Sequence, residues 1–280
     1  MVRIIADTTS SLTLEMAQQL GVDFFPQIII FGDESFRDDT ELDTATFLAK
    51  LKAAPTLPKT AAPPPALYMP LFKELSESGE SAIVICPSSE MSGTVRSATV
   101  AAQEFPTADI RVIDSRTIAT GLGTIVKHAA RWAAEGLPVD EIVAKVENLA
   151  SRERVYFMVD TLEHLYKGGR IGGAQMLFGS ILQVKPILTF KNGRIEPAES
   201  QRTKRRALAR MKELILSECP RAPEANITAM YGDNREETVA FADEIKQALG
   251  VDEIPISLLP SAILVHAGPK VIAVSFFVAE

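Results

Sequence analysis

The segment from Ser81 to Thr94 reads SAIVICPSSEMSGT and joins two different patterns. Ser81 to Cys86 is a short run rich in Ile and Val, which is typical of a strand buried on both faces. Val95 to Phe105 has apolar residues at helical spacing. A strand that passes through a polar turn into a helix is the repeating unit of a parallel α/β sheet. This segment therefore indicates the fold of the first half of the chain.

The same unit recurs around this segment. Val2 to Ala6, Gln27 to Phe31 and Ile110 to Ile113 are also predicted strands, and helical patterns follow most of them. The fold class is therefore predicted to be α/β, with an N-terminal domain, residues 1–153, built on a mostly parallel sheet flanked by helices. Polar turns at Asp7 to Ser10 and at Asp114-Ser115 follow two of these strands, so we expect them to meet the Ser88 turn at one sheet edge.

The second half of the chain has a different pattern. Asn192-Gly193 favours the positive φ angles of a tight hairpin turn between Lys185 to Phe190 and Arg194 to Glu196. Two helices, Arg205 to Leu216 and Glu236 to Leu249, and two later strands, 226–231 and 271–278, follow. We therefore predict a C-terminal α+β domain with antiparallel strands, residues 154–280.

Composition excludes several classes of function. The chain has 280 residues, of which 46% are hydrophobic, and this is enough to bury the cores of two domains. No apolar run approaches the roughly 20 residues of a membrane span, and the sequence opens with a predicted strand instead of a signal peptide. We expect a cytoplasmic protein without stable membrane insertion. The net charge of −7 opposes binding to nucleic acid.

Neither cysteine chemistry nor a metal site is indicated. Cys86 and Cys219 are too far apart for a disulfide framework, and the three His have no ligand spacing. The acidic run Asp38 to Asp43 is predicted to be a solvated loop that leads into the helix Thr44 to Lys52. A local basic cluster is either a solvated helix start or a docking surface for an acidic partner; it comprises Arg202, Lys204, Arg205, Arg206 and Arg210.

Three segments could carry a binding site. Ser88 to Thr94, which includes Ser92 and Gly93, offers hydroxyls and free backbone N–H groups, so it either caps the next helix or binds a carboxylate or phosphate. Gly168 to Gly173 lacks the G-x-G-x-x-G spacing of a dinucleotide site and predicts a sharp turn, which leaves Arg170 as a forked donor. His266 to Pro269 contains a titratable His266 and a flexible Gly268, although a single histidine is more often only a satisfied polar residue.

A proline-rich stretch carries a fourth candidate. The six prolines between Ala53 and Pro70 predict an extended loop with Thr60 on it. Such a loop is either a stiff connector or a support that fixes a hydroxyl over a pocket.

Taken in order, these segments resemble the DegV family of bacterial fatty-acid-binding proteins over nearly the whole chain. The resemblance rests on several motifs together: Asp7 to Ser10, Phe36 to Asp39, Thr60 to Pro63, Ser88 to Thr94, Asp114-Ser115 with Gly121 to Gly123, Leu165 to Ile171, Lys185 to Leu188, Arg202, and His266 to Pro269.

The resemblance implies a binding protein that is not itself an enzyme, with no catalytic residue, metal or cofactor. One long-chain fatty acid would lie in an apolar tunnel, with its carboxylate bound by Thr60 and Ser92 and surrounded by Arg170 and His266. Gly93, Thr94 and Gly268 belong to the same ligand-binding segments. A separate ATP-dependent kinase would phosphorylate the bound acid to an acyl phosphate, and Arg202 would face that kinase.

This chain departs from the family pattern at two places. Ala61 and Ala62 stand where the family often has polar residues, so no head-group contact is expected from this loop beyond Thr60. Lys270 stands where a second glycine commonly follows Gly268-Pro269.

Two other functions remain open from the residues alone. One is a hydrolase with Ser92 or Ser89 as nucleophile and His266 as base, although the G-x-S-x-G elbow is missing. The other is a binder of a small phosphorylated metabolite that uses the same helix start and Arg170.

Overall fold

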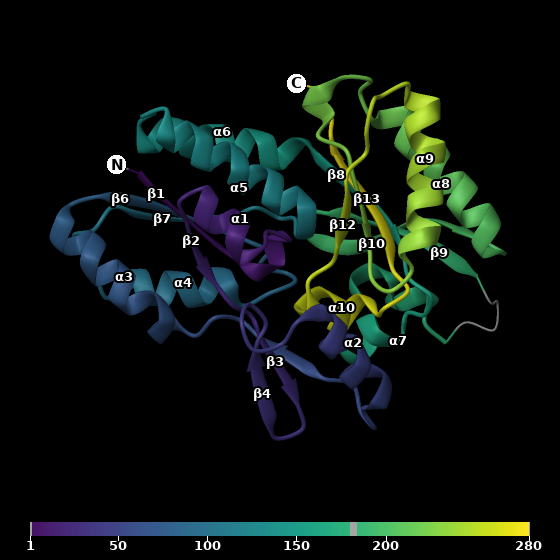
Figure 1. The fold of residues 1–280 in the computed structure, drawn as a ribbon, viewed down its shortest axis with the longest axis horizontal. Helices are drawn as coiled ribbons and strands as arrows, with labels where there is room; N and C mark the ends of the chain where they lie inside the picture. The colour runs from purple at the N-terminus through teal and green to yellow at the C-terminus, as the bar shows by residue number, and fades with distance from the viewer. Residues whose placement is uncertain (1, 180–183, 280) are drawn as a thin grey trace.

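Three β-sheets organise the chain in the computed structural model, which describes residues 2–179 and 184–279. Two large sheets form two lobes that lie side by side, and a small third sheet projects below them (Figure 1). The predicted α/β fold class is confirmed. No helix in the described ranges is both long and apolar enough to cross a membrane.

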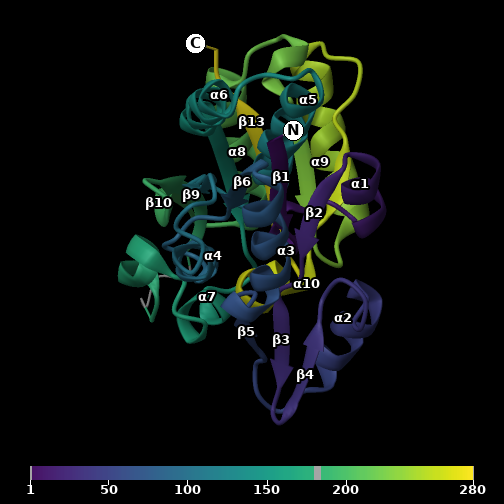
Figure 2. The same cartoon turned by 90° about the vertical axis from the view of Figure 1, so that its left-hand side faces the viewer.

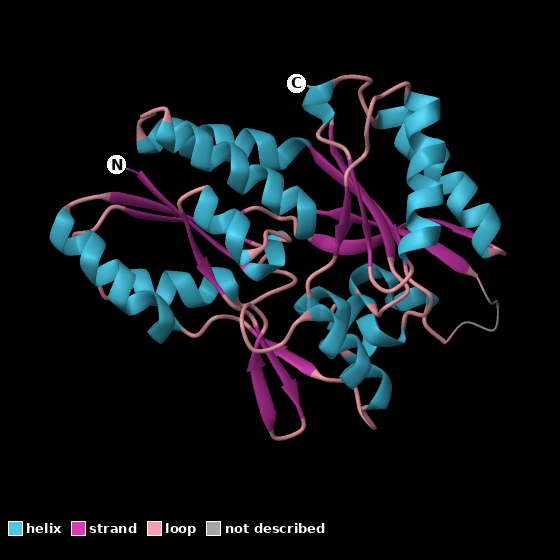
Figure 3. Ribbon diagram, in the orientation of Figure 1, coloured by secondary structure: helices cyan, strands magenta, loops and turns pink. Residues whose placement is uncertain are grey.

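The first lobe contains a four-stranded sheet in which every pair is parallel. Its strand order is β2 (Val22–Phe25), β1 (Val2–Asp7), β6 (Ser81–Cys86) and β7 (Ile110–Asp114). Helices α5 (Ala119–Ala134) and α6 (Val139–Arg152) cover one face, and α3 (Pro65–Ser78) and α4 (Thr94–Gln103) cover the other (Figure 3). Successive strand residues therefore point into different cores: Ile4 packs with α5, whereas Ile5 packs with α3. Burial on both faces explains the continuous apolar runs.

The second lobe contains a six-stranded sheet in which only the pair β11–β12 is parallel. The strands lie in the order β10 (Arg194–Gln201), β9 (Lys185–Lys191), β8 (Glu153–Met158), β13 (Ile272–Phe277), β11 (Thr228–Tyr231) and β12 (Ile256–Leu258). The outer face is covered by α8 (Lys204–Glu218) and α9 (Arg235–Leu249). The opposite, inner face is turned toward α10 (Ser261–Ala267) and α7 (Glu163–Lys167).

The predicted hairpin is confirmed, because Asn192 and Gly193 both have positive φ, 52° and 79°, between β9 and β10. The tip of this hairpin also reaches the first lobe. The buried Ser88 hydroxyl donates a hydrogen bond of 2.7 Å to the Gly193 carbonyl oxygen. A Cβ at Gly193 would lie close to the Ser88 oxygen, so only glycine allows this approach.

The strand at residues 27–31 does not join the parallel sheet, contrary to the alternation that its sequence suggested. It forms β3 (Ile28–Phe31), the centre of an antiparallel sheet with β4 (Glu34–Arg37) and β5 (Lys59–Ala61). Figure 2 shows this sheet beside α2 (Thr44–Ala53) at one end of the molecule. A four-residue apolar run does not determine which strand it pairs with. Here β4 follows directly in the sequence and pairs with β3 as a hairpin.

The proline-rich stretch is also more regular than predicted, so the expectation of an extended loop from Ala53 to Pro70 was wrong. Thr60 lies on strand β5, and helix α3 begins at Pro65 and contains Pro70. Proline is well tolerated in the first turn of a helix because the N–H groups there have no helical partner. Tyr68 and Phe72 of α3 are fully buried against the parallel sheet, and this burial offsets the backbone hydrogen bond that Pro70 cannot make.

Candidate functional site

A narrow pocket lies over the inner face of the six-stranded sheet. The space between its atoms is about 800 Å³, including the part that opens to solvent. We call this narrow pocket the slot. Its apolar wall consists of Met91, Ile118, Ala119, Val155, Phe157, Leu165, Phe190, Ile195, Met230, Leu259, Ala262, Ile263, Ala267, Val271 and Ala273.

The strand register explains the shape of this slot. Ala273 of β13 pairs with Phe157 of β8 on one side and with Met230 of β11 on the other, and all three side chains line the pocket. A small residue between two large neighbours leaves a groove in the sheet face. Such a groove fits an unbranched apolar chain.

Six polar side chains also line the pocket: Thr9, Gln27, Thr60, Ser92, Arg170 and His266. They come from distant parts of the sequence and are connected by contacts. Thr60 Oγ1 lies 2.8 Å from His266 Nε2. Arg170 Nε donates to the Met91 carbonyl oxygen at 3.0 Å. Because Met91 directly precedes Ser92 in the chain, this bond brings the guanidinium close to the Ser92 segment. The pocket thus has one polar end.

His266 of α10 is held in its neutral form. Burial, together with the nearby Arg170 and His164, lowers the pKa of its imidazole to about 4. Nδ1 is buried and has no hydrogen-bond partner among the described residues. A buried lone pair without a partner is tolerated better than a buried N–H, so we assign the proton to Nε2, which then donates to Thr60. This direction leaves the Thr60 hydroxyl hydrogen free for a ligand.

Gly168 makes room for this imidazole. A Cβ at position 168 would clash with His266 Nδ1. The glycine-rich turn after α7 therefore serves close packing, and its carbonyl oxygen also accepts a hydrogen bond of 2.7 Å from Arg170 Nη1.

A second part of the polar end is built on buried Asp7, the last residue of β1. One of its oxygens accepts from Gln27 Nε2 at 2.8 Å and from Thr94 Oγ1 at 3.0 Å. The other accepts from the backbone N–H of Thr9 at 2.8 Å and from the Thr9 hydroxyl. Thr94 in turn lies 2.9 Å from the Ser92 hydroxyl. Burial raises the pKa of the Asp7 carboxyl, and hydrogen bonds from Thr9, Thr94 and Gln27 oppose that rise.

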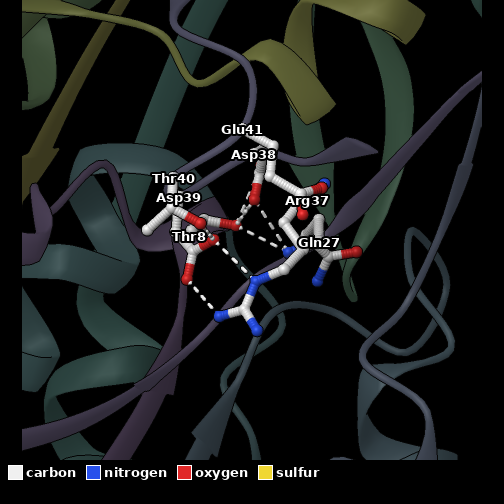
Figure 4. A network of polar contacts seen from close by, with 7 residues as sticks. All are labelled: Thr8, Gln27, Arg37, Asp38, Asp39, Thr40 and Glu41. Atoms are coloured by element: carbon white, nitrogen blue, oxygen red, sulfur yellow. Dashed lines mark hydrogen bonds and ion pairs between the residues drawn. The ribbon is translucent and has the colours of Figure 1, made fainter. Parts of the chain in front are cut away.

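A neighbouring cluster corrects the prediction for the acidic run, which is not wholly solvated. Asp38 accepts from the Thr8 hydroxyl at 2.8 Å and from the Gln27 backbone N–H at 2.9 Å (Figure 4). Burial, with a smaller contribution from Asp7, raises the pKa of Asp38 to about 7. The run is not a solvated loop, because Asp38 holds the chain beside Gln27 through a hydrogen bond and Asp39 forms an ion pair with Arg37. Asp43 caps α2 by accepting a hydrogen bond from the Thr46 backbone N–H.

The structure places four of the predicted ligand-binding residues on the pocket wall: Thr60, Ser92, Arg170 and His266. The other three do not line it. Thr94 contacts the Ser92 hydroxyl through its own hydroxyl. Gly93 directly precedes α4, and a Cβ added there would meet only Ala62 Cβ, at 3.7 Å. Gly268 ends α10 with a φ of 79°.

Arg202 lies in a different surface cleft, which Asp160 and Phe178 also line. It is exposed and shares no lining residue with the polar end of the slot.

Sequence reasoning missed Thr9 and Gln27. Thr9 could have been found, because it follows β1 at the sheet edge where ligands of parallel sheets bind. Gln27 carries no local signal, since its position depends on the small sheet and on Asp7.

The serine and histidine of the hydrolase hypothesis do not form a pair. Ser92 is hydrogen-bonded to Thr94, and His266 to Thr60. Ser89 donates to Asp114 at 2.6 Å.

The lobes and the slot define a class: an α/β protein of two lobes with a mostly apolar pocket whose wall also carries polar side chains. The comparison with family models makes the assignment specific. A model described as "Uncharacterised protein, DegV family" matches residues 1–279, and the chain belongs to this family.

Relatives of known sequence agree with this assignment. A DegV domain-containing protein of Streptomyces coelicolor is 36% identical over 98% of this chain and 97% of its own length. The protein DegV of Bacillus subtilis is 31% identical over 95% of each chain.

Solved structures show the same fold. A DegV family protein from Thermus thermophilus, described by its fatty acid binding, superposes with a TM-score of 0.88 at 29% identity over 99% of both chains. DegV from Bacillus subtilis, described as a fatty acid binding protein, has a TM-score of 0.87 at 30% identity over 99% of both chains.

Proposed function

We propose that this protein binds one long-chain fatty acid, with the acyl chain in the slot and the carboxyl group at the polar end. The observation that carries the proposal is the asymmetry of the pocket. Its wall is apolar over the sheet, and its polar side chains are Thr9, Gln27, Thr60, Ser92, Arg170 and His266. The two solved relatives that are described as binding fatty acids support the same ligand class.

The energetics fit this ligand. Each buried methylene contributes about 0.8 kcal/mol, so roughly 15 methylenes contribute on the order of 12 kcal/mol before ordering costs. A carboxyl group loses several kcal/mol on leaving water unless it is hydrogen-bonded, and the Thr60 hydroxyl and the Arg170 guanidinium can provide such bonds. The tail supplies affinity, and the head group fixes the register.

A small phosphorylated metabolite fits this pocket less well. It would leave the groove over Ala273 empty. The apolar residues of this groove contribute to the binding free energy only when an apolar group of the ligand packs against them. A serine hydrolase is disfavoured by the separate hydrogen bonds of Ser92 and His266.

We further propose that the bound acid is presented to a separate ATP-dependent kinase that forms an acyl phosphate. In this proposal the chain is the substrate-presenting partner and has two domains, residues 1–153 and 154–280, with the ligand between them. Arg202 faces the kinase. Its exposure and its distance from the slot lining suit a docking contact better than a ligand contact.

Native mass spectrometry of the purified protein tests the ligand. The expected result is a mass increment that organic extraction identifies as a long-chain fatty acid. A co-purified small phosphate ester, or a protein that binds no added palmitate, would contradict the proposal.

Arg202→Ala tests the kinase contact. We expect unchanged palmitate binding and slower acyl phosphate formation in a reconstituted reaction with a family kinase and ATP. Arg221→Ala is the matched control, because Arg221 is also exposed and has no hydrogen bond or ion pair within the described ranges. Equal rates for the two variants would remove Arg202 from the interface.

A further inference from the structure

The hydrogen-bond directions around Asp7 determine which form of a carboxyl group the polar end prefers. The starting point is the set of four donors to Asp7: the Thr9 N–H, the Thr9 hydroxyl, Gln27 Nε2 and the Thr94 hydroxyl. Two donors on each oxygen satisfy an ionised carboxylate, which only accepts. A protonated Asp7 would instead have to reverse its bond to the Thr9 or the Thr94 hydroxyl.

These donors leave Thr94 no hydrogen to offer elsewhere. Its single hydroxyl hydrogen goes to Asp7, and its oxygen accepts from Gln27 Nε2 at 3.1 Å. In the contact of 2.9 Å between Ser92 and Thr94, Ser92 must therefore be the donor. The Ser92 oxygen then turns a lone pair, and no hydrogen, toward the pocket.

The same argument applies to the other two side chains in contact with Asp7. The Thr9 hydroxyl hydrogen is used on Asp7, so the pocket meets only its lone pairs. The Gln27 amide nitrogen is likewise turned toward Asp7 and Thr94, so its carbonyl oxygen is the free acceptor. Thr9, Gln27 and Ser92 thus form a wall of acceptors.

The second wall consists of donors. Thr60 has a free hydroxyl hydrogen because His266 Nε2 donates to it, and Arg170 retains N–H groups after bonding Met91 and Gly168. An ionised carboxylate complements only this wall. A neutral carboxylic acid complements both, because its O–H can donate to the acceptors while its C=O accepts from the donors.

We infer that Asp7 is a positioning residue whose buried carboxylate makes this site select the protonated, neutral form of its acid. The inference rests on the proposed function, since it concerns the head group of the same ligand. The charged and titratable groups around the polar end are Asp7, Asp38, Arg170, His164 and His266, with Lys59, Glu163 and Lys167 in the adjoining cleft. Arg170 favours the ionised acid, and Asp7 and Asp38 oppose it.

The test uses palmitic acid labelled with ¹³C at its carboxyl carbon, bound to the full chain. The chemical shift of that carbon reports ionisation directly as pH is varied. In the wild-type protein the midpoint is expected at least about one unit above the value of roughly 4.3 for an unperturbed carboxyl side chain. A midpoint at or below that value overturns the inference.

Asp7→Asn adds a directional test. The new amide donates where the carboxylate accepted, and Gln27 must turn its carbonyl oxygen toward it. Thr94 can then donate to Ser92, and Ser92 can donate to the ligand. We expect the midpoint to fall and palmitate binding at pH 8 to tighten by roughly fivefold, the effect of one hydrogen bond. Structural damage alone would weaken binding, so weaker or unchanged binding by a folded variant contradicts the inference.

Glu153→Gln is the matched control. It also converts a buried carboxyl to an amide, but Glu153 does not line the slot and no hydrogen bond joins it to Asp7 in the described ranges. Its midpoint should equal that of the wild type, and an equal shift in both variants would contradict a specific role for Asp7. If Asp7→Asn does not fold, the wild-type titration decides alone. A wild-type protein that shows no bound ¹³C signal refutes the proposed function itself.

Discussion

Ala273→Leu should shorten the acyl chain that the protein accepts. Ala273 lies between Phe157 and Met230 on the inner face of the sheet, and all three line the slot. Leucine adds about three methylene-sized groups to this groove, so it displaces a similar length of ligand. At about 0.8 kcal/mol for each methylene, losing two or three of them costs roughly 2 kcal/mol, a factor of about 30 in affinity.

Isothermal titration with acids of decreasing length measures this effect. The loss should be confined to long acids, and an acid shorter by about four carbons should bind the variant and the wild type equally. Ala273→Val is the graded control and should give an intermediate loss. Because the added side chain fills empty space, the ligand-free variant should unfold at the same or a higher temperature. Unchanged affinity for palmitate, or an equal loss at every length, would show that the chain does not lie over Ala273.

Three further predictions concern other parts of the structure. Thr60→Val removes the hydroxyl that meets His266 and should weaken palmitate binding by about 1–2 kcal/mol, measured by titration calorimetry, with the fold intact. Gly168→Ala should push the His266 ring away from Thr60 and weaken binding to a similar extent in the same assay. Glu153→Gln should reduce the loss of stability at high pH. Burial raises the pKa of Glu153 to about 8 from its usual 4.5, so the folded state holds a proton that the unfolded state releases, and stability falls as pH rises between these values. Urea unfolding should give the variant and the wild type similar free energies of unfolding at pH 5. At pH 9 the free energy of unfolding should be larger for the variant.

Controls separate these effects from general damage. Thr107→Val changes an exposed threonine far from the slot lining and should leave binding unchanged. Gly93→Ala places its Cβ at an ordinary contact distance of 3.7 Å from Ala62, so it should be tolerated where Gly168→Ala is not. Equal losses in a variant and its control, or a wild type whose stability does not decline between pH 5 and pH 9, would contradict the respective reasoning.

The sequence predicts the elements of this fold better than their partners. The apolar runs of β1, β6 and β7 identify a buried parallel sheet, because only burial on both faces allows such runs. Asn192-Gly193 predicts its hairpin because few other residues adopt the required φ. The pairing of strands that lie far apart in the sequence is not encoded locally. For this reason the sequence predicts β3 in the parallel sheet and β5 as part of a loop, and both predictions are wrong.

The candidate site shows the same limit. Thr60, Ser92, Arg170 and His266 could be selected in advance because each lies in a segment with a recognisable motif. Gln27 could not be selected, since its amide is oriented by Asp7 and its backbone by Asp38, which are distant in the sequence. A buried carboxylate that acts through its neighbours leaves no pattern in a single sequence, because its effect depends on which donors reach it.

The contact between Ser88 and Gly193 has a consequence for ligand exchange. It joins the tip of the β9–β10 hairpin to the turn that leads to Ser92, so the two lobes cannot spread apart there without exposing a buried hydroxyl and carbonyl. Opening along this seam is therefore costly. Other hydrogen bonds also join the lobes, from Arg170 to the Met91 carbonyl oxygen and between the Thr120 and Ser275 hydroxyls. A lipid should accordingly enter and leave without separation of the two lobes.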